Sequence, residues 1–298
     1  MYPIYDPIGT KEECKEVNIG FPPQHQELPG FEYKMRPRPI SINPDYIGSG
    51  KLKDKVAIIT GGDSGIGRAV AYAFVKEGAH VAISYLNEHN DAKETMEFIE
   101  NSGGKCILIP GDLRNPSTSK EVVEKTLNTF GKIDILINNQ GMQVFQNSIL
   151  DISIEQLIKT FETNVFGYFY LTQAALPFLK KGSTIVNTTS ITGYEGNANM
   201  IDYSATNGAR TSFTRSLALS LIDKGIRVNG VAPGPIWTPL QPASQPQEDL
   251  TVFGSKTPTG RAGQPFEVAS CYVFLASDDS SYMTGQVFHP NGGTIVAG

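Results

Sequence analysis

A repeated alternation of two patterns constrains the fold of this chain more than any other sequence feature. From Lys55 onward, short apolar runs such as VAIIT (residues 56–60) alternate with stretches whose apolar residues recur at helical spacing. Runs of this kind are typical of strands that are buried on both faces. Strands that alternate with amphipathic helices predict a parallel sheet with helices packed on both of its sides. No second domain is needed to explain the pattern.

The same reasoning gives approximate positions for the elements. Strands are predicted near residues 56–60, 80–85, 106–110, 133–138, 183–189, 226–232 and 286–289. Helices are predicted from residue 66 to a stop at Gly78, and near residues 91–102, 117–130, 154–180, 202–223 and 266–276. The segment after Pro233 holds several prolines and is expected to be an irregular loop.

The first 50 residues have a different composition and hold eight of the 19 prolines. Proline fixes φ and removes a backbone donor, so this segment is expected to be extended and poor in helix and sheet. It also carries apolar side chains such as Phe21, Phe31 and Met35, for which a fully solvated tail has little use. We therefore expect residues 1–50 to form an arm over their own domain or a neighbouring subunit, and residues 51–298 to form the α/β domain. A flexible leader is the alternative.

Composition argues against several classes of protein. Lys and Arg number 25 against 30 Asp and Glu, a net charge of −5 without a basic block, so no nucleic-acid partner is expected. The three cysteines (Cys14, Cys106 and Cys271) are an odd, widely spaced set, so neither a disulfide framework nor a metal site is expected. No stretch approaches the roughly 18 apolar residues of a membrane span, and the N-terminus lacks the apolar core of a secretory signal. The expectation is a cytoplasmic protein without a membrane partner.

A glycine-rich turn joins the first predicted strand to the first predicted helix. It reads Thr60-Gly61-Gly62-Asp63-Ser64-Gly65-Ile66-Gly67. In a doubly wound sheet, the first strand–turn–helix unit is where the pyrophosphate of a dinucleotide sits. Glycine lets the backbone approach the phosphates, and the helix N-terminus supplies unpaired N–H groups. A tight turn would explain the glycines alone, but their position between a buried strand and a helix favours a dinucleotide site.

Polar motifs follow the later strands in a definite order. They are Asn138-Asn139-Gln140-Gly141 after the fourth strand, Asn164 in a long helix, Ser190 at the end of the fifth strand, Tyr203 at the start of the next helix, and Pro233-Gly234 with Thr238 after the sixth strand. In order and spacing, these motifs resemble the short-chain dehydrogenase/reductase family over residues 50–298. The arm segment Phe21-Pro22-Pro23-Gln24-His25-Gln26 and the stretch through Trp237 are also similar to a bacterial branch of general-stress-type oxidoreductases.

The resemblance implies a Rossmann-type fold and hydride transfer between a nicotinamide cofactor and a carbonyl/alcohol pair. It also implies a homotetramer, which the apolar residues of the helices near 154–180 and 202–223 support. Gly61, Gly65 and Gly67 would cradle the pyrophosphate. Asp112 would contact the adenine, and Asn138 would support the central strand and the cofactor. The other residues implied at the cofactor are Asp63, Ser64, Ile66, Tyr85, Leu113, Gly141, Tyr203, Asn207, Pro233, Gly234, Ile236 and Thr238.

The resemblance also implies the catalytic residues, and here the chain departs from the family. Ser190 would hold the substrate oxygen, and Tyr203 would exchange a proton with it. The family pattern Tyr-x-x-x-Lys reads Tyr203-Ser204-Ala205-Thr206-Asn207 in this chain. In the family, the lysine holds the nicotinamide ribose, lowers the tyrosine pKa and joins a proton path that includes Asn164. Asn207 can keep hydrogen bonds to the ribose, but it carries no charge.

Two readings of the function follow from this departure. The chain is either a slow or specialised oxidoreductase, or a dinucleotide-binding pseudoenzyme with little turnover. Arg210, three residues beyond Asn207, is one candidate for the missing charge; alternatively, it is solvated or lies in a subunit contact. In the first reading, Asn207→Lys is expected to raise the rate of alcohol oxidation, unless Arg210 repels the new charge.

Cofactor choice and substrate are less well marked. Neither an acid for the ribose 2′-hydroxyl nor a base for a 2′-phosphate ends the second strand. Because Asp63 would repel a 2′-phosphate, NAD(H) is favoured over NADP(H), unless Arg68 reaches the phosphate. Gln140 stands where the family most often has alanine, and its amide either contacts the nicotinamide pocket or the substrate, or points outward. The residues expected to bind or enclose the substrate are Gln140, Ser190, Tyr203 and Trp237, with Leu240 and Phe253 as further walls.

Overall fold

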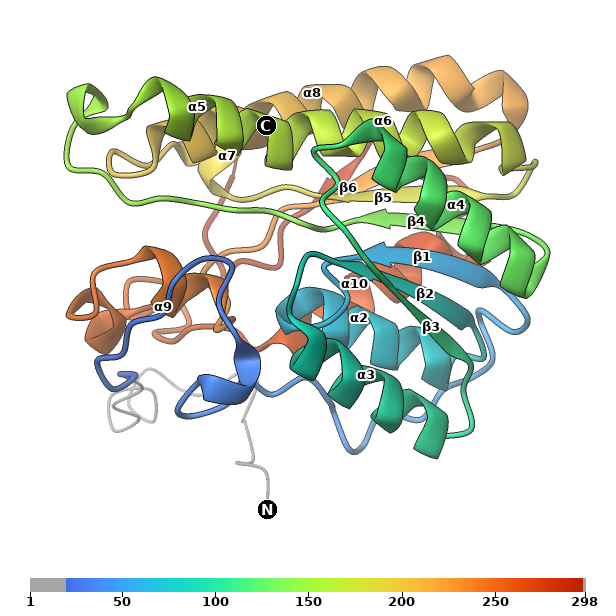
Figure 1. Cartoon of the computed structure of the whole chain (residues 1–298), viewed down its shortest axis with the longest axis horizontal. Helices are drawn as coiled ribbons and strands as arrows, with labels where there is room; N and C mark the ends of the chain where they lie inside the picture. The colour runs from blue at the N-terminus through green and yellow to red at the C-terminus, as the bar shows by residue number, and fades with distance from the viewer. Residues whose placement is uncertain (1–19, 297–298) are drawn as a thin grey trace.

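A single parallel sheet runs through the centre of the computed structural model, which describes residues 20–296. Its strand order is β3-β2-β1-β4-β5-β6-β7, and every neighbouring pair is parallel (Figure 1). The strands are β1 (Val56–Thr60), β2 (His80–Tyr85), β3 (Cys106–Pro110), β4 (Ile135–Asn138), β5 (Thr184–Thr188), β6 (Arg227–Val231) and β7 (Val287–Phe288). The predicted Rossmann-type, doubly wound sheet is confirmed.

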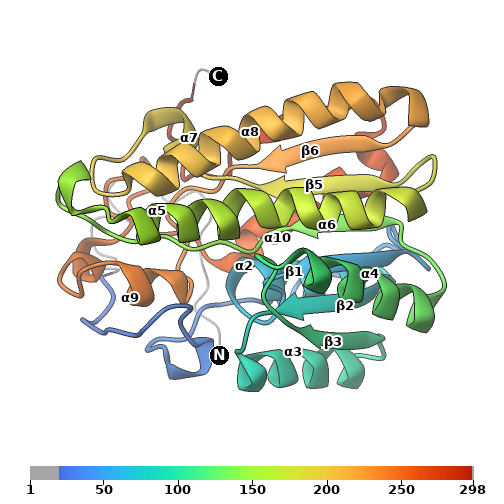
Figure 2. The same ribbon diagram turned by 45° about the horizontal axis from the view of Figure 1, so that its top comes forward.

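Helices cover both faces of this sheet (Figures 1 and 2). One face carries α2 (Gly65–Lys76), α3 (His89–Asn101) and α10 (Pro265–Ala276). The other face carries α4 (Pro116–Phe130), α5 (Ile154–Phe161), α6 (Gly167–Ala175) and α8 (Ile201–Leu221). The short helices α7 (Thr192–Glu195) and α9 (Leu240–Ser244) lie at the end of the sheet to which the strands point. Among the helices of residues 20–296, none is long and apolar enough to cross a membrane.

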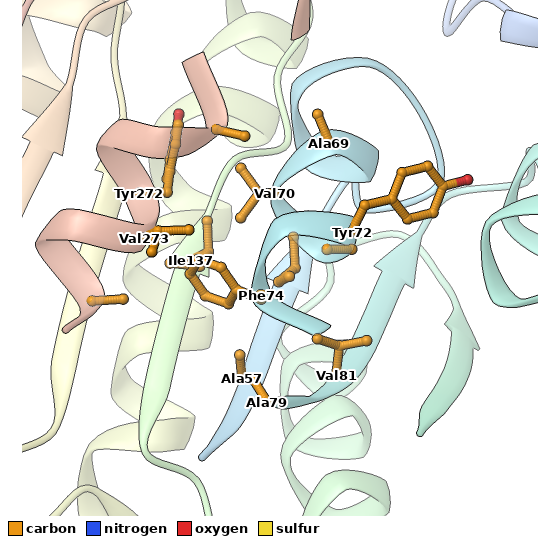
Figure 3. Close-up of a cluster of buried hydrophobic side chains, with 14 of the residues drawn as sticks. Ala57, Ala69, Val70, Tyr72, Phe74, Ala79, Val81, Ile137, Tyr272 and Val273 are labelled. Atoms are coloured by element: carbon orange, nitrogen blue, oxygen red, sulfur yellow. The ribbon is translucent and has the colours of Figure 1, made fainter. Parts of the chain in front are cut away.

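Strand β1 shows why the apolar runs of this sequence lack a polar face. All five of its residues are buried. Ala57 and Ile59 pack in a cluster with residues of α2 and α10, whereas Ile58 packs in a second cluster on the opposite face. Figure 3 shows the first cluster, in which Phe74 and Val273 reach the sheet from these two helices. Successive side chains of the strand point to opposite faces, and helices cover both faces. Neither set of side chains therefore has to be polar.

The helix predicted near residues 154–180 is divided. A π-helical turn, Glu162–Phe166, separates α5 from α6, and a 3-10 turn, Leu176–Phe178, follows α6. Such a π-helical turn inserts one extra residue into the helix and is found frequently at functional sites. Asn164 lies within this turn and is fully buried.

Residues 20–49 lie against the domain as an extended segment with one 3-10 turn, Glu32–Lys34. The ring of Phe21 stacks on Trp237 with centroids 3.7 Å apart, and Met35 is buried in the same cluster. Trp237 Nε1 also donates a hydrogen bond to Pro37 O (2.9 Å). The first 19 residues of the predicted arm, with Cys14, lie outside the described residues. The boundary at residue 50 stays a prediction.

Candidate active site

A cavity opens at the carboxyl ends of β1 and β4, where the strand order reverses. Open α/β sheets bind their ligands at this point. The walls come from the turn between β1 and α2, from the segments that follow β2, β3, β4 and β5, and from the segment after β6. The predicted site residues that line it are Gly61, Asp63, Ser64, Gly65, Ile66, Tyr85, Asp112, Leu113, Gln140, Gly141, Ser190, Tyr203, Pro233, Gly234, Ile236 and Thr238.

The glycine turn fits the pyrophosphate of a dinucleotide. Gly61 and Gly65 have φ values of +60° and +53°, which residues with a Cβ atom rarely adopt. Within residues 20–296, the N–H groups of Ile66 and Gly67 at the start of α2 have no hydrogen-bond partner. Unpaired N–H groups at a helix N-terminus bind phosphate oxygens. The turn can therefore hold a nicotinamide dinucleotide.

Gly67 has a packing role in addition to the one predicted. It does not line the cavity, and a Cβ added at this position would lie 1.9 Å from Gly61 O. Glycine is needed here because the first turn of α2 packs directly on the backbone of the preceding turn.

The arm supplies a carboxylate to the same helix end. Glu32 accepts hydrogen bonds from Gly65 N (2.6 Å) and from Arg68 Nη1 (2.7 Å). Burial raises the pKa of Glu32, and the Arg68 charge opposes that rise. Arg68 also donates to the backbone O of Asp91 (2.9 Å) and does not line the cavity. The alternative in which Arg68 reaches a 2′-phosphate is therefore wrong for this conformation.

The hydroxyls of Ser190 and Tyr203 belong to elements that meet at the cavity. Ser190 follows β5 by two residues rather than ending it, and Tyr203 lies in the first turn of α8. Ser190 Oγ accepts hydrogen bonds from Thr192 N (3.2 Å) and Thr192 Oγ1 (3.1 Å). These two bonds orient Ser190 and leave its own proton to be donated into the cavity.

Asn164 and Asn207 lie behind this pair and do not line the cavity. Asn164 exchanges two hydrogen bonds with the backbone of Met142, both 2.8 Å long, and donates to Thr206 Oγ1 (3.1 Å). Asn207 is fully buried and donates from Nδ2 to Tyr203 O (2.9 Å) in its own helix. The Asn207 amide thus faces back along α8, and its contact with a nicotinamide ribose stays a prediction.

Arg210 is buried and lines the cavity. It donates to Asn164 O from Nε, to Gln140 O from Nη2 (2.9 Å) and to Asn207 Oδ1 from Nη1 (3.3 Å). The alternatives in which Arg210 is solvated or forms a subunit contact are wrong, since only 2% of its surface is exposed.

Two carboxylates, Asp63 and Glu88, line the cavity beside the end of β2. Burial and the charge of Glu88 raise the pKa of Asp63 to about 8. Burial also raises the pKa of Glu88. Asp112 lies at the end of β3 and pairs with Arg114, whose Nη2 is 2.6 Å from its Oδ2. Burial opposes ionisation of Asp112, but the Arg114 hydrogen bonds outweigh it and lower the pKa of this carboxyl.

Four further predicted residues have contacts that differ, in whole or in part, from those expected. Trp237 is 0% exposed and does not line the cavity, because Phe21 and Phe253 pack against it; Phe253 is therefore not a wall either. Asn138 does not line the cavity, but it donates to Asn187 Oδ1 (2.9 Å) and joins β4 to β5, which agrees with its predicted support of the central strand. Gln140 lines the cavity, but its Oε1 accepts a hydrogen bond from Thr60 Oγ1 and is thereby turned towards the sheet.

Sequence reasoning missed several residues of the cavity wall. They include Leu28 and Pro29 of the arm, Asn87, Glu88, Arg114, Lys159, Met142 and Gln241. Glu88 carried a signal, since it is an acid three residues beyond the end of β2. No sequence pattern could have identified the arm residues, because their position depends on contacts between distant parts of the chain.

Comparisons with known proteins agree with this arrangement. A family model described as enoyl-(acyl carrier protein) reductase matches residues 61–294. The chain is 60% identical to the uncharacterized oxidoreductase YhdF of Bacillus subtilis, over 98% of this chain and 99% of that protein. It is 56% identical to general stress protein 39 of the same organism, with coverages of 90% and 94%.

A plant relative and a solved structure extend these matches. NADPH-dependent aldehyde reductase 1, chloroplastic, of Arabidopsis thaliana is 52% identical, over 92% of this chain and 97% of that protein. The structure of a short chain dehydrogenase from Burkholderia cenocepacia J2315 in complex with NADP matches with a TM-score of 0.76 and 31% identity. That match covers 82% of this chain and 98% of the solved one. This chain is therefore an oxidoreductase that belongs to the short-chain dehydrogenase/reductase family, in the branch of the Bacillus general stress oxidoreductases.

Proposed function

We propose that this chain interconverts a carbonyl and an alcohol with an NAD(P) cofactor, and that Ser190 and Tyr203 act on the reacting oxygen. The observation that carries the proposal is that both hydroxyls line the cavity that the glycine turn also lines. The cofactor, when bound, supplies or accepts the hydride. Hydride delivery leaves negative charge on the substrate oxygen, and aligned hydroxyl donors stabilise such charge.

The two hydroxyls have separate tasks in this proposal. Ser190 holds the substrate oxygen, because Thr192 orients its Oγ. Tyr203 exchanges a proton with the same oxygen. Proton transfer is most efficient when the pKa of the acid lies near the working pH, whereas a reference tyrosine titrates near 10. The proposal therefore requires positive charge close to Tyr203, and Asn207 supplies none.

A dinucleotide-binding protein with little turnover is the second candidate, and Asn207 is the observation that favours it. Its buried amide bonds to Tyr203 O rather than reaching the cavity. The first candidate is supported by Arg210, which brings a positive charge to the cavity wall, and by relatives that are named as reductases or oxidoreductases.

One experiment separates the two candidates. Binding of NAD(H) and NADP(H) is measured beside turnover on a panel of aldehydes, ketones and alcohols, for the wild type and Tyr203→Phe. Tyr170→Phe, which removes a hydroxyl from α6 outside the cavity, is the matched control. Turnover that is lost only in Tyr203→Phe supports the enzyme. Binding without turnover supports the second candidate, and absence of binding refutes both.

We also propose that NAD(H) binds more tightly than NADP(H). Asp63 and Glu88 line the cavity, and neither forms an ion pair with a base of residues 20–296. A 2′-phosphate at this end would lie beside two carboxyl groups that repel it when they are ionised, and the repulsion by Asp63 grows as the pH approaches 8. The NADPH-dependent plant relative and the NADP-bound neighbour support the opposite preference. Calorimetric titration with both cofactors decides between them, and tighter NADP(H) binding would refute the proposal.

A homotetramer is the proposed assembly, in a cytoplasmic location that stays a prediction. Large apolar side chains are exposed along α5, the π-helical turn and α6, among them Ile158, Phe166 and Phe169. Burial of such surface against another copy is favourable. Light scattering at micromolar concentration tests this, and Phe169→Glu is expected to reduce the mass. A monomeric wild type would refute it.

A further inference from the structure

One residue outside the predicted catalytic set has a role in the proposed reaction, and this inference rests on the proposed function. We propose that Arg210 is a positioning residue that supplies the positive charge that Asn207 lacks and favours the ionised form of Tyr203. The charge is displaced by three positions along α8, and the long arginine side chain brings it back to the cavity.

Helix geometry places Arg210 where this is possible. Tyr203 and Arg210 are seven residues apart on α8, so they lie on the same face of the helix with a rise of about 10 Å between them. Helical side chains lean towards the N-terminus, which for Arg210 means towards Tyr203. The observed contact of Arg210 Nη1 with Asn207 Oδ1 (3.3 Å) places the guanidinium over the preceding turn.

The contacts of Arg210 hold the guanidinium without neutralising it. Its three acceptors, Asn164 O, Gln140 O and Asn207 Oδ1, are all uncharged. No carboxylate of residues 20–296 forms an ion pair with it. A buried charge is costly unless it is paired. A buried guanidinium without an acidic partner at a cavity wall therefore stabilises any anion that forms beside it. In the proposed reaction, the anions are the Tyr203 phenolate and the alkoxide of the substrate.

Tyr168 of α6 packs against the Arg210 guanidinium. The Arg210 guanidinium lies 4.3 Å from the centroid of the Tyr168 ring, and the Tyr168 hydroxyl donates to Gln140 O (3.2 Å) and Thr188 O (3.1 Å). Burial raises the pKa of Tyr168 to about 12, with Arg210 opposing and Tyr203 adding to the rise. Tyr168 therefore stays neutral beside the Arg210 guanidinium and does not compensate its charge.

The other titratable groups on α8 and on the elements packed against it have partners elsewhere, face solvent or, in the case of Tyr194 and His289, pack against each other. Lys159 of α5 also lines the cavity, but it is exposed and its charge acts on Asp112. Glu162 of the π-helical turn pairs with Arg114. Asp202 accepts hydrogen bonds from Gln156 and Thr160. The remainder are Glu155 of α5, Tyr194 and Glu195 of α7, Arg215 of α8, Arg227 of β6 and His289 after β7. Arg210 is thus the buried cation of the cavity wall that has no acidic partner among residues 20–296.

The test measures ionisation of Tyr203 in the protein without cofactor. Ultraviolet difference absorption is recorded against pH for each variant and for the same variant with Tyr203→Phe, so that the difference isolates one phenol. Arg210→Met removes the charge, Arg210→Gln removes it but keeps a hydrogen-bond donor, and Arg210→Lys keeps it. Arg215→Met removes an exposed charge from the same helix and is the matched control. The pH profile of kcat is measured in parallel.

We expect Arg210→Met and Arg210→Gln to raise the ionisation midpoint of Tyr203 by at least one pH unit, a tenfold loss of phenolate below the midpoint. Arg210→Lys should keep most of the wild-type value, and Arg215→Met should match the wild type. The proposal is overturned if the neutral variants titrate like the wild type or if Arg215→Met shifts the midpoint equally. If Arg210→Met fails to fold, Arg210→Gln decides. Should no substrate be turned over, the proposed function fails while the titration still decides the role of Arg210.

Discussion

Restoring a lysine at position 207 should destabilise this chain, because Arg210 already holds a positive charge beside that position. Arg210 Nη1 lies 3.3 Å from Asn207 Oδ1, so an ammonium in place of the amide would be about 4 Å from the guanidinium. Two like charges at this distance repel by about 4 kcal/mol at an effective dielectric constant of 20. Loss of a proton by the buried lysine would limit the cost. We therefore expect Asn207→Lys to lower the free energy of unfolding by up to about 4 kcal/mol at pH 7.

Urea unfolding of five proteins separates charge from size. They are the wild type, Asn207→Lys, Arg210→Met and the double variant, with Asn207→Met as a control for the length of the new side chain. The double variant should be more stable than the sum of the single effects predicts, by roughly the repulsion energy of the pair. If Asn207→Lys unfolds like Asn207→Met, or if the cycle shows no coupling, the charge of Arg210 does not act at position 207. The simple expectation that lysine there raises alcohol oxidation would then stand again.

Three further predictions follow from the geometry. Phe21→Ala should lower the free energy of unfolding by up to about 3 kcal/mol, because it removes the ring that stacks on buried Trp237. Faster proteolysis of the arm and a lower Tm would show this, whereas an unchanged Tm would contradict it. Asp63 has its pKa raised to about 8, so its ionisation opposes folding as pH rises from about 4 to 8. That loss of stability amounts to about 1.4 kcal/mol for each pH unit that separates the folded and unfolded pKa values. Asp63→Asn should abolish it, which thermal melts across this pH range would show. Gly67→Ala should abolish cofactor binding in calorimetry, because its Cβ would overlap Gly61 O at 1.9 Å.

The sheet and its helices could be predicted because they depend on local patterns. The residues of β1 are apolar without alternation, and this strand is buried on both faces. The main strands and helices begin and end within a few residues of their predicted bounds. The exception is the helix near residues 154–180, where the π-helical turn at Asn164 has no sequence pattern of its own.

The composition of the cavity could be predicted in part for a topological reason. The carboxyl ends of parallel strands meet at one edge of a sheet, so motifs that follow β1, β4, β5 and β6 must converge there. The glycine turn, Ser190 and Tyr203 do so. Gly67 belonged to the same motif, but its role in close packing could be separated from phosphate binding only when the position of Gly61 O was known.

The sequence by itself determined the fold, the family and the edge of the sheet at which chemistry takes place, because these depend on periodicity and strand order. Only the tertiary structure decided where the long side chains end. Trp237 donates a hydrogen bond to the backbone oxygen of Pro37, 200 residues earlier, and so anchors the arm instead of facing a substrate. Arg210 reaches backbone oxygens of Asn164 and Gln140 on two other segments and so lies at the cavity rather than in solvent. The direction of a flexible side chain depends on partners that are distant in sequence, and no local pattern records them.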